Sequence, residues 1–479
     1  MASIKKNFFY SAFLTSANYI FPLLTLPYLT RVLGVTNYGL CSFIDSVVNY
    51  FILFSTMGIA IVGIREIASA KNDTEKLNRT FKDLFVVNAL FTVAAIVVLI
   101  AATFLVPKLY EERELMFFGA FKVAFNFLLI EWFYKGIEDF RFITVRTLLV
   151  KCLYVAAIFI FVRSSDDYAV YYLLSMLVIA VNAIINITYS RKWISFTLRG
   201  VELRRFLRPL ITYGVYAILT SFYTTFNVVY LGFATSDEQV GYYTVATRLY
   251  AIFISMVTAF TGVMMPRMSS LLSEGRKEEF RKMYGNSVQV LCSVTLPTVI
   301  FTIIMAPQIV TLLAGPDYGE AVMPMRVVLP LMFIIGYEQI MIVQALMPLR
   351  RDNVVLRNSI IGALAGVALN VILVGKLEAV GSAIVWLSCE VLILLLSQMA
   401  IRRVLGEEFP LRSVGVNLAV YAPLLLLWPL RGVLHSGSFI SLLVCGLITL
   451  GYFTVVQCKV FPETLCGSYL LKLFRKVGI

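Results

Sequence analysis

A small set of ionisable side chains lies inside or at the ends of long apolar runs of this 479-residue chain. A charged side chain at the centre of a bilayer costs at least about 2.5–3.5 kcal/mol, so such residues face a wet cavity or a partner. Lysine and arginine at these positions suit an anionic ligand, and the planar arginine fork matches phosphate oxygens. The predicted binding set consists of five cations and one acidic partner, namely Arg31, Asp45, Lys122, Arg146, Lys151 and Arg248.

Asp45 and Arg248 each lie about two helical turns from the outer end of a predicted helix. An internal repeat with a shift of about 202 residues makes the two positions nearly equivalent. We therefore predict that they face each other as an ion pair across a central cavity. The alternative is that each residue pairs within its own half of the chain.

Two further pairs of charges lie on the predicted helices around 115–135 and 142–162. Glu131 and Arg146 should each lie within about 6–8 Å of the cytoplasmic face, and we expect them to pair in a structural role. Lys122 and Lys151 lie deeper and have no obvious partner in the sequence. Unpartnered cations at that depth favour an anionic ligand, although snorkelling to an interface explains one of them almost as well.

Glu338 and Glu390 are the best candidates for carboxylates that couple transport to an ion gradient. The alternative is that they only neutralise nearby cations. Neither a metal site nor a cofactor is expected, because the chain has one histidine, His435, and seven cysteines without a C-x-x-C pair. The acidic pairs elsewhere occupy loops and are interpreted as solvated turns.

The composition assigns the chain to a bilayer. Hydrophobic residues make up 59% and charged residues 14%, whereas a soluble chain has about 45–50% apolar and about 25% charged residues. The formal net charge of +13 has no polar domain on which to gather, which argues against a nucleic-acid partner. The sequence thus predicts an all-α, polytopic membrane protein.

Apolar runs long enough to cross a bilayer recur along the whole chain, and about fourteen can be distinguished. Their approximate ranges are 8–30, 38–64, 83–106, 115–135, 142–162, 168–189, 209–233, 241–265, 286–313, 322–347, 355–375, 378–401, 413–430 and 438–458.

The distribution of lysine and arginine predicts the orientation. With the N-terminus inside, roughly thirty basic residues fall in cytoplasmic loops and only a few in outer loops, which predicts that both termini are cytoplasmic. Every predicted outer loop is short, and the longest has about ten residues. An O-antigen polymerase or ligase needs larger outer loops to hold an acceptor and catalytic carboxylates, so we expect no enzyme and no catalytic residues.

A shift of about 202 residues aligns the first two predicted helices with the seventh and eighth. Six spans separate the copies, so the repeats are parallel and related by an axis along the membrane normal. This predicts two six-helix lobes around a central cavity, followed by two more helices. The predicted divisions are a first lobe at 1–190, a cytoplasmic amphipathic linker at 191–208, a second lobe at 209–403, and the last two helices with a tail at 404–479.

Several short motifs resemble the Wzx-type O-antigen and polysaccharide flippases of the multidrug/oligosaccharidyl-lipid/polysaccharide exporter superfamily. The motifs are Pro27-Tyr28-Leu29-Thr30-Arg31-Val32-Leu33-Gly34, Tyr38-Gly39-Leu40, Gly63-Ile64-Arg65-Glu66, and Val240-Gly241-Tyr242-Tyr243 with Ala246, Arg248 and Leu249. The resemblance covers the chain in length, helix number and lobe arrangement. Arg31, Asp45 and Arg248 fall in the motif regions that border the cavity in that family.

The resemblance implies a flippase that moves an undecaprenyl-diphosphate-linked oligosaccharide from the cytoplasmic to the periplasmic leaflet by alternating access. It places the protein in the bacterial inner membrane, with the polysaccharide polymerase and chain-length proteins as candidate partners. A multidrug or cation antiporter of the same superfamily is the nearest alternative, since the deep cations outweigh the deep acids by a thin margin. A membrane polymerase or ligase is the alternative from another class.

Overall fold

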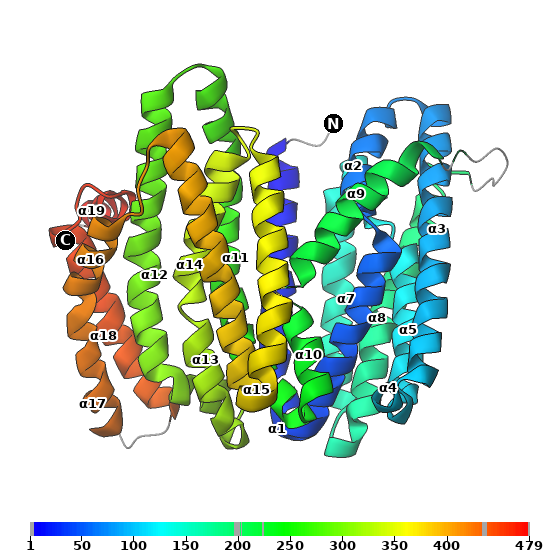
Figure 1. Ribbon diagram of the computed structural model, residues 1–479, viewed down its shortest axis with the longest axis horizontal. Helices are drawn as coiled ribbons and strands as arrows, with labels where there is room; N and C mark the ends of the chain where they lie inside the picture. Colours follow the sequence, from blue (N-terminus) through cyan, green and yellow to red (C-terminus); the bar gives the residue numbers. More distant parts are fainter. Residues whose placement is uncertain (1–3, 196–201, 203, 223–224, 434–437, 478–479) are drawn as a thin grey trace. The chain divides into compact units, whose positions relative to one another are not determined.

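The computed structural model of the chain describes residues 4–195, 202, 204–222, 225–433 and 438–477. Every regular element in these ranges is a helix (Figure 1), which confirms the all-α prediction. The chain divides into two compact units, unit 1 at residues 1–241 and unit 2 at residues 242–479. The lobe boundaries and the central cavity stay predictions, and the proposed linker at 191–208 lies partly outside the described residues.

Ten helices in the described part of the chain are long and apolar enough to cross a membrane, or eleven if one bent pair counts as a span. Two of them, Ile20–Ala70 and Asp352–Leu405, have 51 and 54 residues. At about 1.5 Å per residue each is more than twice as long as a hydrocarbon core of about 30 Å is thick. The backbone leaves helical geometry at Gly34 in the first and at Glu378 in the second. The multi-pass prediction is confirmed, and the count of fourteen spans stays a prediction.

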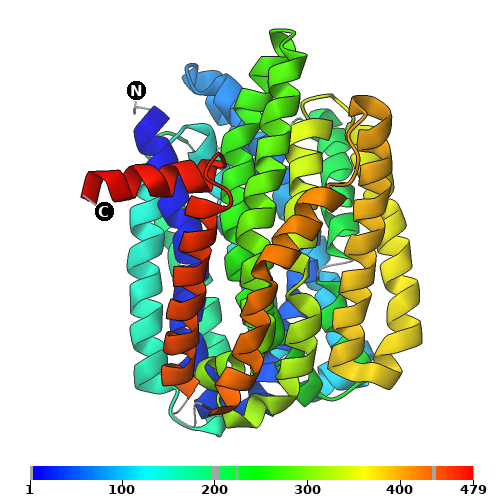
Figure 2. The same cartoon turned by 90° about the vertical axis from the view of Figure 1, so that its left-hand side faces the viewer.

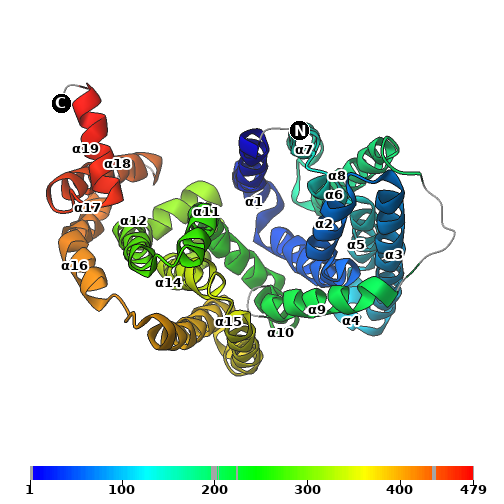
Figure 3. The same cartoon turned by 90° about the horizontal axis from the view of Figure 1, so that it is seen from above.

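Unit 1 is a bundle in which α3, α5 and α8 stand side by side, as the view along the helices shows (Figure 3). Its helices are α1 (Ile4–Thr56), α2 (Ile59–Ala70), α3 (Thr74–Leu105), α4 (Pro107–Glu111), α5 (Arg113–Leu128), α6 (Glu131–Gly136), α7 (Phe140–Phe161), η1 (Ser165–Asp167), α8 (Tyr168–Ser190), α9 (Arg204–Ser221), α10 (Phe226–Ala234) and the start of α11 (Asp237–Ser273).

Helix α7 has the surface pattern of a helix that packs on one side and faces lipid on the other. Val145, Leu149 and Leu153 recur every four residues and form an exposed apolar stripe. Polar residues such as Thr144 and Arg146 are buried against the rest of the unit. Large exposed apolar stripes are rare on soluble monomers, and a hydrocarbon solvent removes the penalty for them.

The aromatic core of unit 1 lies near the cytoplasmic end predicted for α2, α3 and α6. The ring of Trp132 stacks on Phe81 with centroids 5.4 Å apart, and both side chains belong to the same buried cluster. On α2, a Cβ atom at Gly63 would lie 2.7 Å from the Trp132 ring, so only glycine permits this approach. The core therefore fixes the short helix α6 against α2.

Unit 2 carries a second buried cluster, around Tyr284, Tyr337 and Met341. In Figure 2, α19 runs across the end of α18. The helices of unit 2, which also contains the rest of α11, are α12 (Lys277–Leu313), η2 (Pro316–Ala321), α13 (Val322–Val328), α14 (Leu331–Gln339), the π-helix η3 (Ile340–Leu346), α15 (Asp352–Leu405), α16 (Leu411–Tyr421), η4 (Ala422–Leu426), α17 (Leu427–Val433), α18 (Ser438–Lys459) and α19 (Leu465–Val477).

Candidate functional site

Lys122 has a counter-charge inside unit 1, contrary to the expectation that it lacks a partner. Its Nζ atom, on α5, donates a hydrogen bond to Oδ1 of Asp45 on α1 and another to Oγ of Ser175 at 3.2 Å. The ammonium also lies 4.4 Å from the centroid of the Tyr172 ring on α8. The lysine side chain is only 7% exposed, whereas the Asp45 side chain is 44% exposed. Asp45 is therefore the exposed residue of this ion pair, and Lys122 is the buried one.

Lys151 also has a partner that the sequence did not reveal. Its Nζ atom on α7 donates a hydrogen bond of 2.6 Å to Oδ1 of Asn18 on α1. The same atom lies 5.8 Å from the centroid of the Phe21 ring. Both corrections have one cause, because α1 packs against α5 and α7, and helix packing cannot be derived from depth along a single helix.

Glu131 and Arg146 form the pair that the sequence predicts. Nη2 of Arg146 lies 3.3 Å from Oε1 of Glu131, and Nη1 donates to Oδ1 of Asn182 at 2.8 Å. Glu131 also pairs with Lys135 at 3.3 Å. One carboxylate is thus shared by two cations, of which Arg146 is buried and Lys135 is 36% exposed.

Arg31 and Arg248 are both exposed, one in each unit. Nη1 of Arg31 donates to the backbone oxygen of Pro27 at 2.6 Å, which holds the side chain along its own helix. Arg248 lies on α11 in unit 2. Asp45 is bonded to Lys122 within unit 1, and its predicted pairing with Arg248 stays a prediction.

Glu338 and Glu390 meet inside unit 2. Both side chains are buried, and the two carboxyl groups are near neighbours. Oε2 of Glu338 has no hydrogen-bond partner among the described residues. Nε1 of Trp386 donates to Oε1 of Glu390 at 3.0 Å. Neither carboxyl forms an ion pair with a lysine or arginine in the described ranges. Glu338 lies near the end of α14, which is followed by the π-helix η3, a helix type that is frequent at functional sites.

Two helix breaks adjoin each other in unit 1. The first separates α1 from α2 at Met57 and Gly58, and the second separates α5 from α6 at Ile130, all three with positive φ. A β-branched residue such as Ile130 rarely adopts this conformation. Buried amides bond to backbone carbonyl groups at the interrupted helix ends. Nδ2 of Asn88 donates to the backbone oxygen of Ser55, and Nδ2 of Asn186 donates to the backbone oxygen of Leu129.

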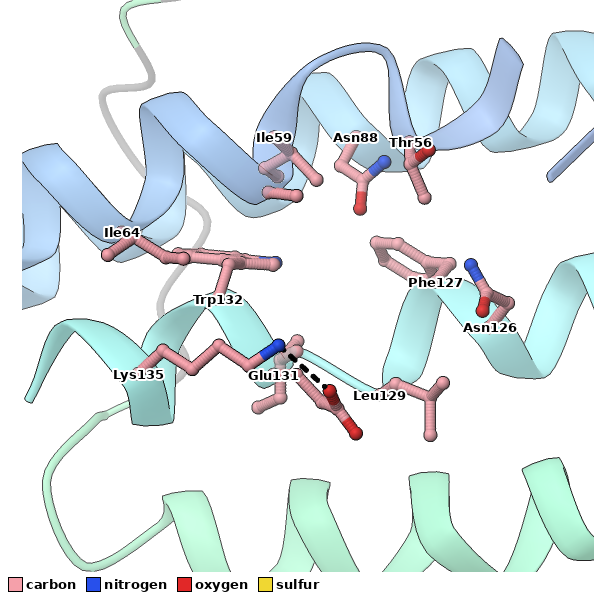
Figure 4. Close-up of a pocket in the computed structure, with 12 residues that line it drawn as sticks. Thr56, Ile59, Ile64, Asn88, Asn126, Phe127, Leu129, Glu131, Trp132 and Lys135 are labelled. Atoms are coloured by element: carbon pink, nitrogen blue, oxygen red, sulfur yellow. Dashed lines mark ion pairs between the residues drawn. The ribbon is translucent and has the colours of Figure 1, made fainter. Parts of the chain in front are cut away.

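A pocket of about 170 Å³ lies between these two breaks (Figure 4). Figure 4 shows Thr56 and Asn88 on one side, the Glu131–Lys135 ion pair on the other, and the rings of Trp132 and Phe127 between them. The lining residues are Thr56, Ile59, Ala60, Ile64, Asn88, Asn126, Phe127, Leu129, Ile130, Glu131, Trp132 and Lys135.

The predictions from the sequence rest on charged side chains and therefore do not include the amides of this region. Asn88, Asn126, Asn182 and Asn186 all interrupt apolar runs. A primary amide inside a membrane helix must find hydrogen-bond partners just as a charge must. Uncharged polar residues within the predicted spans were therefore an available signal.

The sequence of this chain is similar to those of known proteins. A family model described as "Polysaccharide biosynthesis protein" matches residues 4–272, more than half of the chain. The chain belongs to that family. This family member is 25% identical over 403 residues to a putative O-antigen transporter of Escherichia coli (strain K12), covering 84% of this chain and 97% of the relative. It is 25% identical over 195 residues to a probable flippase, AglR, of Haloferax volcanii, covering 40% of this chain and 41% of the relative.

The fold of this family member is also that of solved membrane transporters. An inward closed structure of the lipid II flippase MurJ superposes with a TM-score of 0.76 at 13% identity, covering 96% of this chain and 99% of that one. An inward-facing multidrug resistance transporter of the MATE family and MOP superfamily gives 0.63 at 16% identity, covering 81% and 95%. The family match and these folds confirm the resemblance found in the sequence motifs.

Proposed function

We propose that this chain is a flippase that carries an undecaprenyl-diphosphate-linked oligosaccharide from the cytoplasmic to the periplasmic leaflet by alternating access. The observation that carries the proposal is the similarity to two putative O-antigen transporters, which extends over 97% and 100% of their lengths. A diphosphate cannot cross about 30 Å of hydrocarbon unshielded, and fixed cations lower that barrier. Lys151, a cation within a predicted span of unit 1, is consistent with such a ligand.

We assign the six residues of the predicted binding set to two roles, according to how exposed their side chains are. Arg31 and Arg248 are exposed, so we assign them to direct contact with the diphosphate, where an arginine fork can bind two oxygens. Lys151 donates a hydrogen bond to a neutral amide and forms no ion pair with the described residues, so we assign it to the same ligand. Lys122 and Arg146 are buried against carboxylates, so we assign them, together with Asp45, to positioning α1, α5 and α7.

Glu338 and Glu390 are the residues to which we assign ion coupling. Two buried carboxyl groups that lie next to each other repel when both are ionised, so the pair favours holding one proton. Release of that proton would leave two buried negative charges next to each other, which is unfavourable without a counter-ion. The pair is therefore suited to exchange a proton when the surrounding helices open.

We place the protein in the bacterial inner membrane with both termini in the cytoplasm, because the basic residues concentrate in the loops on that side. The polymerase and chain-length proteins of a polysaccharide locus are the partners that would consume its product. A multidrug antiporter is the second candidate, favoured by the MATE fold likeness alone. A polymerase or ligase is disfavoured by the short loops between the predicted spans.

A deletion strain tests the proposal directly. We expect loss of surface polysaccharide, accumulation of lipid-linked oligosaccharide in the inner membrane, and rescue by the wild-type gene. Export of cationic dyes should be the same with and without the gene. Unchanged surface polysaccharide in the deletion strain, or dye export restored by the gene, would exclude a flippase in favour of the antiporter.

A further inference from the structure

The pocket between the two helix breaks of unit 1 is lined by polar side chains that keep unused hydrogen-bond donors or acceptors. The Asn126 side chain makes no hydrogen bond with the described residues. Asn88 uses its Nδ2 donor on Ser55 and retains an acceptor oxygen. Glu131 is 34% exposed and retains acceptor sites beyond its two ion pairs. Lys135 retains donors beyond its bond to Glu131.

The rest of the lining is apolar, with the rings of Phe127 and Trp132 and the side chains of Ile59 and Ile64 (Figure 4). A pocket of about 170 Å³ corresponds to roughly five or six water molecules at about 30 Å³ each. This space accommodates one small ring and excludes a whole oligosaccharide.

The mixture of groups selects one class of ligand. A cation would meet the ammonium of Lys135, and an anion would meet the carboxylate of Glu131. A purely apolar ligand would leave the side-chain oxygen of Asn88 and the amide of Asn126 without partners, which is unfavourable in a desolvated site. A neutral hydroxylated ring satisfies every group, because each hydroxyl both donates and accepts while the C–H faces contact apolar walls.

We propose that this pocket is a subsite for a single sugar ring of the lipid-linked oligosaccharide. The subsite presupposes the flippase function proposed above and is separate from the exposed arginines assigned to the diphosphate. Its position supports a role in transport, because broken helices in transporters line substrate sites. A sugar bound between the breaks would stabilise the conformation in which the two bends enclose the pocket, by its difference in affinity for the two conformations.

Two substitutions test the subsite without removing an ion pair. Ala60 lines the pocket and is exposed, so Ala60→Phe fills the space without displacing core atoms. Ala68 is exposed on the same helix but does not line the pocket, and Ala68→Phe is the matched control. Asn126→Leu keeps a similar side-chain volume and removes the unpartnered amide.

The measurement is the affinity of purified full-length protein in nanodiscs for two probes. One probe is the lipid-linked oligosaccharide extracted from the deletion strain, and the other is undecaprenyl diphosphate. We expect the wild type and Ala68→Phe to bind the oligosaccharide lipid at least about tenfold more tightly than undecaprenyl diphosphate. Ala60→Phe should lose most of this preference, and Asn126→Leu should lose about three- to tenfold of it, the equivalent of one or two hydrogen bonds.

The outcomes separate the subsite from the flippase. Equal affinity of the wild type for both probes, together with full rescue of surface polysaccharide, would overturn the subsite and show that the pocket holds only water. Retention of the preference in Ala60→Phe would also overturn it. Failure of the wild type to bind either probe or to rescue polysaccharide would overturn the flippase itself.

Discussion

The ion pair of Asp45 and Lys122 gives the sharpest prediction, because its two members differ so strongly in exposure. The lysine side chain is 7% exposed and the aspartate 44%. Asp45→Asn leaves a buried ammonium without its counter-charge. Lys122→Met leaves a carboxylate that solvent already reaches. The first substitution should therefore be more destabilising than the second.

The expected magnitudes follow from these exposures. Breaking a fully buried pair costs about 3–5 kcal/mol, and an exposed pair contributes about 0.2–1 kcal/mol. For this half-buried pair we expect Asp45→Asn to lower the free energy of unfolding by about 2 kcal/mol. Lys122→Met should lower it by about 1 kcal/mol, part of which is the lost contact with the Tyr172 ring.

The double variant Asp45→Asn/Lys122→Met should lower the free energy of unfolding by only about 1 kcal/mol and so be more stable than Asp45→Asn alone, with a coupling energy of about 2 kcal/mol. The assay is the unfolding of the purified protein in an SDS titration, followed by tryptophan fluorescence. The exposed pair of Arg402 and Glu408 is the control cycle and should show no measurable coupling.

Flipping activity decides what the pair is for. If Lys122 positions helices, the double variant keeps most of the wild-type rescue of surface polysaccharide, because a neutral pair replaces an ion pair of zero net charge. A double variant no more stable than Asp45→Asn would refute the coupling. A stable but inactive double variant would refute the positioning role and assign Lys122 to direct contact with the substrate.

Three further predictions follow from the structure. Arg248→Ala should insert normally and reduce flipping at least about tenfold in a polysaccharide assay, since an arginine–phosphate contact is lost, whereas Arg402→Ala on the surface should not. Gly58→Ala should lower the free energy of unfolding by about 2–3 kcal/mol, because φ is +73° and a Cβ would lie 2.7 Å from the backbone oxygen of Leu210. The control is Gly285→Ala, which should not destabilise the protein because the space around its Cβ is open. Glu390→Gln should leave the protein folded, because the amide oxygen can still accept the hydrogen bond from Nε1 of Trp386. It should make flipping insensitive to a proton uncoupler, and sensitivity equal to that of wild type would count against the coupling role.

The sequence predicted those features that depend on composition and on position along a single helix. The apolar runs and the basic loops predicted an all-α, multi-pass protein, and the motifs around Arg31 and Arg248 indicated the family. Glu131 and Arg146 were predicted to pair, because both positions have similar depth on consecutive helices. These inferences need only the length of a helix and the thickness of a bilayer.

Contacts between helices that are distant in sequence were decided by the tertiary structure alone. Lys122 and Lys151 were expected to lack partners, yet α1 supplies Asp45 to one and Asn18 to the other. The pairing of Glu338 with Glu390 depends in the same way on α14 lying against α15. Depth along a helix follows from residue number, whereas the face that meets a neighbour depends on packing and on breaks such as Ile130. The sequence therefore identified which charges lie in the membrane, and only the fold determined which of them are neutralised.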